Sequence, residues 1–129
     1  MDAADRGVPI PAESLALARE ALDAHRAGSA RTVDAGVKVA MGTDSPPYGT
    51  PPANELDELP PMTRASSMPP EGAWRAATAN AAALLRRDGL GTIAPGRIAV
   101  LVVVDGRRDD LRGLRDRIRR VTIGGRRVR

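Results

Sequence analysis

The chain has 129 residues, which is enough for one domain or for part of a larger one. It contains no cysteine, and this excludes disulfides, thiolate metal sites and cysteine nucleophiles. No apolar run approaches the roughly 20 residues of a membrane-spanning helix, and the N-terminus lacks the apolar core of a signal peptide. A soluble cytoplasmic protein without a membrane partner is therefore expected.

The charge is concentrated at the C-terminal end. The chain carries a net charge of +4, but residues 106–129 hold ten Arg against three Asp. Such an end could bind a polyanion or a protein partner. Of the basic residues only Lys38 is a lysine, and a GC-rich coding sequence explains that bias as well as phosphate binding does. A nucleic-acid partner is therefore not the favoured interpretation, and the basic end is expected to be a solvated face.

In chain order, the first predicted element is a helix from Ala12 to Ala27, where apolar residues recur every three or four positions. It could extend to Gly36, a natural helix-ending glycine, with a kink or break at Gly28. The apolar run Val37–Met41 then predicts a short buried strand. Gly42, Thr43 and Asp44 follow, so a carboxylate is expected at the C-terminal end of that strand, where α/β proteins carry their chemistry.

The middle of the chain is rich in proline. Residues 45–53 contain four prolines and predict a stiff loop that could form one wall of a pocket. Asn54 is a plausible N-cap for a helix over Glu55–Leu59, which Pro60 and Pro61 should end early. The clearest helix is predicted from Pro70 to about Arg87, with Pro and Glu in its first turn and many alanines.

The C-terminal part predicts β structure. Pro95 and Gly96 should form the tip of a turn, and Ile98–Val104 is the strongest strand signal. Residues 109–119 predict a charged loop or short helix around Leu111 and Leu114. A hairpin should follow, with strands at 121–123 and 126–129 joined by a tight turn at Gly124 and Gly125.

Four stretches occur in an order and at a spacing that resemble the C-terminal part of the metal-dependent amidohydrolase superfamily. They are AGVKVAMGTD at 35–44, AWRAATANAAALL at 73–85, LGTIAPGRIAVLVVVDG at 90–106 and VTIGGRRV at 121–128. The nearest similarity is to the imidazolonepropionase-like and prolidase-like branch. The resemblance implies an α/β fold. Residues 1–90 would form the last strand and closing helices of a (β/α)8 TIM barrel, and residues 91–129 the C-terminal strands of a small β-sandwich built from both chain ends.

The resemblance also implies a chemistry. The family hydrolyses C–N bonds, and in some members C–O bonds, of small molecules with one or two divalent metals, commonly zinc. Asp44 matches the residue that ligates the metal and takes the proton from the attacking water. Thr43 and Ser45 would flank the substrate, and Asn54 could lie at the mouth of the pocket. Without the resemblance, Asp44 reads as a turn or cap residue and Asn54 as an N-cap.

Much of the family's site has no counterpart in this sequence. The family's remaining metal ligands are mostly histidines, whereas His25 is the single histidine and falls on the helix before the strand. A (β/α)8 barrel also needs about 250 residues. The chain is therefore expected to be an inactive fragment that needs the remaining barrel segment and could form a homo-oligomer. The alternative is a non-enzymatic basic module, which would show salt-dependent binding to a polyanion such as heparin.

Overall fold

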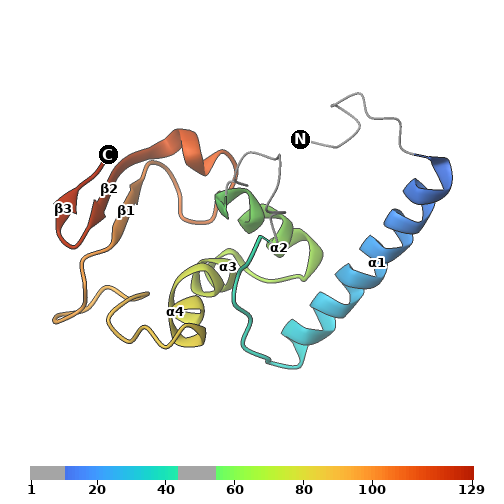
Figure 1. Ribbon diagram of the computed structural model, residues 1–129, viewed down its shortest axis with the longest axis horizontal. Coiled ribbons are helices and arrows are strands. Elements are labelled where there is room, and N and C mark those ends of the chain that lie inside the picture. The colour runs from blue at the N-terminus through green and yellow to red at the C-terminus, as the bar shows by residue number, and fades with distance from the viewer. Residues whose placement is uncertain (1–10, 44–54) are drawn as a thin grey trace.

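The computed structural model describes residues 11–43 and 55–129 (Figure 1). Short helices in the middle of the molecule separate a long helix on one side from a small sheet on the other. The helical elements are α1 (Ala12–Asp34), the 3-10 turn η2 (Glu55–Glu58), α2 (Leu59–Ala65), α3 (Pro70–Arg75), the π turn η3 (Ala76–Asn80), α4 (Ala81–Leu84) and the 3-10 turn η4 (Leu114–Arg117). The strands are β1 (Leu101–Val104), β2 (Ile118–Ile123) and β3 (Arg126–Arg127).

Helix α1 is continuous, so the predicted break at Gly28 is wrong. Its end at Gly36 is confirmed, because this residue takes the left-handed conformation with φ of 71°. The amide of Gly36 donates to the carbonyl of Val33 at 2.9 Å, and that of Val37 donates to Thr32 at 3.2 Å. This pair of bonds is the Schellman arrangement, which satisfies the last carbonyls of the helix.

The strand predicted at Val37–Met41 does not form. The segment after α1 is irregular and lies against the helical run instead of a sheet. The expected burial is also not found, because Val37 is 56% exposed and residues 39–41 are only partly buried. The apolar pattern did not specify a partner, and a strand requires a hydrogen-bonded neighbour. Within residues 11–43 and 55–129, the three strands all belong to the C-terminal sheet.

Helix α2 corrects the prediction that Pro60 and Pro61 end a helix. They lie in its first turn, after the 3-10 turn η2. The first amides of a helix have no intrahelical acceptor, so two residues without an N–H cost nothing there. The same prolines that would break a helix interior therefore begin one here.

The helix predicted from Pro70 is confirmed as one continuous helical run through α3, η3 and α4. It ends at Leu84, slightly earlier than expected, because Arg86 takes the left-handed conformation with φ of 53°. The amide of Arg87 donates to Ala82 at 2.8 Å and completes a second Schellman-type end. The π turn η3 in its middle was not predicted.

The C-terminal sheet is antiparallel with the order β1-β2-β3. The predicted hairpin is confirmed: Gly124 and Gly125 have φ of 57° and 80° and join β2 to β3, as a type I′ turn requires. Strand β1 is shorter than predicted, since Ile98–Val100 forms a tight turn in which the amide of Val100 donates to Ile98 at 2.8 Å. The turn at Pro95 and Gly96 is also confirmed.

The core is small and lies between the helices and the segment before η4. Its buried apolar residues among those described are Leu59, Met68, Ala73, Ala76, Leu111 and Leu114. Leu111 and Leu114 therefore join the helical half to the C-terminal half. The indole Nε1 of Trp74 adds a hydrogen bond of 2.8 Å to the carbonyl of Arg108. None of the helices in the described part of the chain is long and apolar enough to cross a membrane.

Candidate functional site

The segment 37–43, which leads toward the predicted site, is fixed to the helical run by two hydrogen bonds. The amide of Met41 donates to the carbonyl of Ala76 at 3.1 Å. The side-chain amide Nδ2 of Asn80 donates to the carbonyl of Val39 at 2.7 Å. Both contacts come from η3, and Ala76 is completely buried. A segment without strand partners is thus held at two alternate residues.

Of the site residues predicted from the sequence, the structure describes Thr43, which is partly buried at the end of this segment. Asp44, Ser45 and Asn54 lie outside the described residues. Their predicted roles as ligand, base and substrate contacts therefore stay predictions. The contact of Asn80 with Val39 was not predicted from the sequence. An asparagine in the middle of an alanine-rich helix was the available signal, because such residues are unfavourable there.

A cavity of about 910 Å³ lies beside the same segment. Its walls are α1 and α2, and residues 39–42 line it between the two helices. His25 lines it from α1, Met62 lines it from α2, and Ser66 lines it just after the end of α2. His25 is exposed there.

The residues described by the structure do not fit a complete metal site. Among residues 11–43 and 55–129, no group of three or more His, Asp or Glu side chains is close enough to hold an ion. A catalytic zinc site needs about three protein ligands. We therefore derive no reaction step at a metal from these residues.

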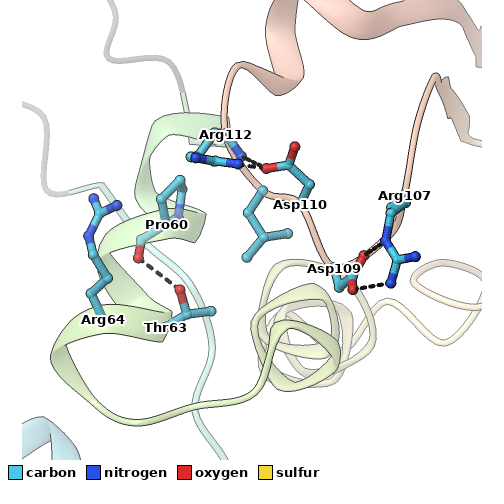
Figure 2. Close-up of a pocket in the computed structure, with 8 residues that line it drawn as sticks. Pro60, Thr63, Arg64, Arg107, Asp109, Asp110 and Arg112 are labelled. Carbon is cyan, nitrogen blue, oxygen red and sulfur yellow. Dashed lines mark hydrogen bonds and ion pairs between the residues drawn. The ribbon is translucent and has the colours of Figure 1, made fainter.

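A second hollow, of about 430 Å³, lies between α2 and the loop before η4 (Figure 2). Arg107 donates to Asp109 through Nε at 2.9 Å and Nη2 at 2.7 Å, and Arg112 Nε donates to Asp110 at 3.1 Å. These hydrogen bonds lower the pKa of both Asp109 and Asp110, and the first pair raises the pKa of Arg107. Asp110 is partly exposed and the other three residues are exposed, so the pairs orient the loop more than they stabilise the fold.

Two further arginines of the basic end are also used within the chain. Arg117 donates to the backbone carbonyls of Asp105 at 2.9 Å and of Arg112 at 3.0 Å, and also to that of Asp110. Arg119 pairs with the carboxylate of Asp105. Part of the Arg-rich end therefore holds the loop between β1 and β2 together, which gives these residues a structural use that polyanion binding does not require.

The family model of the "Amidohydrolase family" matches residues 2–128, so the chain belongs to that family. An imidazolonepropionase of Salinispora tropica is 40% identical over 75 residues, which are 58% of this chain and 19% of that protein. A crystal structure of an amidohydrolase matches with a TM-score of 0.75 and 30% identity over 92% of this chain and 29% of that one. The chain is thus imidazolonepropionase-like and spans about a fifth of the curated relative.

Proposed function

We propose that this chain is the C-terminal part of a metal-dependent amidohydrolase that hydrolyses C–N bonds in small amides or cyclic amides. In this proposal residues 1–90 complete a (β/α)8 barrel, and residues 91–129 belong to a second, β-rich domain. The family match over residues 2–128 supports this assignment. So does the share of the solved amidohydrolase that the chain covers, 29% of its length.

The observation that carries the proposal is the anchoring of residues 39–41 on the π turn. The bonds from Met41 to Ala76 and from Asn80 to Val39 fix the chain three residues before position 44. We assign Asp44 as the base, since its carboxylate can take a proton from the attacking water and pass it to the leaving nitrogen. Asp44 would also be one oxygen ligand of a divalent metal, zinc in our proposal, with Thr43 and Ser45 beside the substrate.

The other ligands must then come from outside these 129 residues. The described part of the chain offers no metal-binding cluster, and the curated relative is about five times longer than the stretch it shares with this chain. We infer that the chain alone is inactive and that its first partner is the remaining barrel segment.

The test is hydrolysis by the native gene product purified from its source, whatever its full length. A panel of cyclic amides should include imidazolonepropionate, because the curated relative is named for it. Removal of the base by Asp44→Asn should lower kcat on the order of a thousandfold. The matched control is Asp88→Asn, which removes an exposed carboxylate after α4 and should leave kcat unchanged. Activity of Asp44→Asn within threefold of the wild type would remove Asp44 from this role.

A further inference from the structure

Asn80 makes a contact that its position in the sequence does not explain. It lies at the end of η3, within a helical run that is otherwise rich in alanine. Its amide does not bond its own helix but reaches the carbonyl of Val39, 41 residues away in the sequence, at 2.7 Å. The bond is partly buried, so water competes with it less than at the surface.

The neighbouring bond from Met41 to Ala76 makes the contact a pair. Val39 and Met41 are two residues apart, and both are held by the same π turn, one through its carbonyl and the other through its amide. The next residue, Gly42, is exposed, and a Cβ added to it would meet nothing within 4 Å. Met41 is therefore the last backbone position before residue 44 that a described hydrogen bond fixes.

We propose that Asn80 is a positioning residue for Asp44: its amide donor holds Val39 and so sets the direction in which the chain leaves η3 toward the site. The proposal rests on the function proposed above for Asp44. It requires a donor at position 80, since the group it meets is a carbonyl. An ionised carboxylate of the same shape has no donor and would face that carbonyl oxygen unfavourably.

Thr78 offers a matched control within the same turn. Its hydroxyl donates to the carbonyl of Trp74 at 2.7 Å, four residues earlier, and is exposed. Replacing it removes a local helix bond without touching residues 37–43. If Asn80 merely supported the helix, Asn80→Asp and Thr78→Ala should have similar effects.

The experiment uses the native gene product and its Asn80→Asp, Asn80→Ala and Thr78→Ala variants. The first measurement is amide hydrogen exchange of the peptide covering residues 37–43. The loss of one hydrogen bond should speed its exchange roughly two- to tenfold in both Asn80 variants. In Thr78→Ala the peptide should exchange within twofold of the wild type. Asn80→Asp keeps the size of the side chain, so it still tests the loss of the donor if Asn80→Ala fails to fold.

The second measurement is turnover of the best cyclic amide. Displacement of the base should lower kcat on the order of tenfold in Asn80→Asp, with KM changed much less. Unchanged exchange of the peptide 37–43 in Asn80→Asp would show that the hydrogen bond from Asn80 does not hold Val39. Faster exchange with unchanged kcat would overturn the positioning role. If exchange is faster in Asn80→Asp but the wild type hydrolyses no cyclic amide, the hydrogen bond to Val39 is confirmed and the proposed function is rejected.

Discussion

Gly91 and Gly96 have the same backbone conformation and different surroundings. Their φ values are 82° and 80°, in the left-handed region where side chains with a Cβ are strained. A Cβ on Gly91 would lie 2.8 Å from the carbonyl oxygen of Thr78 and 2.8 Å from the Cβ of Ala82. A Cβ on Gly96 would meet nothing within 4 Å. Gly91 therefore packs directly on the π turn and on α4, whereas the position of Gly96 is open.

This difference makes a paired prediction. Gly96→Ala should lower the free energy of unfolding by about 1 kcal/mol, from backbone strain alone. Gly91→Ala carries the same strain and a clash with the backbone of η3, so it should cost roughly 2–4 kcal/mol. Urea denaturation of both variants measures the difference. Equal losses would mean that the close packing of Gly91 on Thr78 is not present in solution.

At this scale, sequence patterns predicted the turns whose residues favour them. Gly36, Gly96 and the pair Gly124 and Gly125 all adopt the positive φ expected of them. Ser67 and Arg86 also have φ of 53°, and their residue types did not indicate this. Each directly follows the C-cap of a helix, where a left-handed residue commonly ends the helix.

Among the elements, those with local signals were predicted and those that depend on distant partners were not. The helix from Ala12, the helical run from Pro70 and the hairpin after Thr122 follow from periodicity and turn residues. The segment Val37–Met41 has the pattern of a buried strand but lies on a helix, since its pattern could not specify a neighbour. The hydrogen bond from Asn80 joins residues 41 positions apart, so the local sequence pattern could not predict it either.

The loop between β1 and β2 depends on Arg117. Its guanidinium bonds three backbone carbonyls, those of Asp105, Asp110 and Arg112. A Cβ on Gly106 would lie 2.6 Å from its Nη1, so the backbone approaches the guanidinium closely. The planar fork of arginine can reach several carbonyls at once, which a single ammonium group cannot.

We therefore expect Arg117→Lys to lose two of these three bonds and to lower the free energy of unfolding by about 2 kcal/mol. Arg115→Lys, in the same 3-10 turn, is the control because its side chain is exposed. Thermal melts of the two variants give the comparison. Equal melting temperatures for Arg117→Lys and Arg115→Lys would show that the hydrogen bonds of the Arg117 guanidinium do not stabilise the loop.

Considered as a whole, the molecule leaves large apolar side chains exposed on several elements, α1 and β1 among them. Leu17 on α1 is 67% exposed, and Val102 and Val103 on β1 are 53% and 52% exposed. Figure 1 shows these elements at opposite sides of the central helices. Strand β1 is also an edge of the described sheet, and an exposed apolar edge favours association.

The 129-residue chain alone should consequently self-associate. Sedimentation velocity should show larger species that increase with concentration, and Val103→Lys should reduce them, because a charge on an edge strand opposes pairing. Ile93→Lys is the control, since Ile93 is 89% exposed but lies in a loop. A monomer at all concentrations would show that these exposed apolar surfaces do not cause the chain to associate.

The most direct test of the account is the metal content of the native gene product, measured by elemental mass spectrometry. We predict one or two divalent ions per chain in the wild type and in Asp88→Asn. Asp44→Asn should lose at least one of them, and the 129-residue chain alone should retain none. Full metal retention in Asp44→Asn, or a wild-type gene product without stoichiometric metal, would contradict the assignment of this chain to a metal-dependent hydrolase with Asp44 in its site.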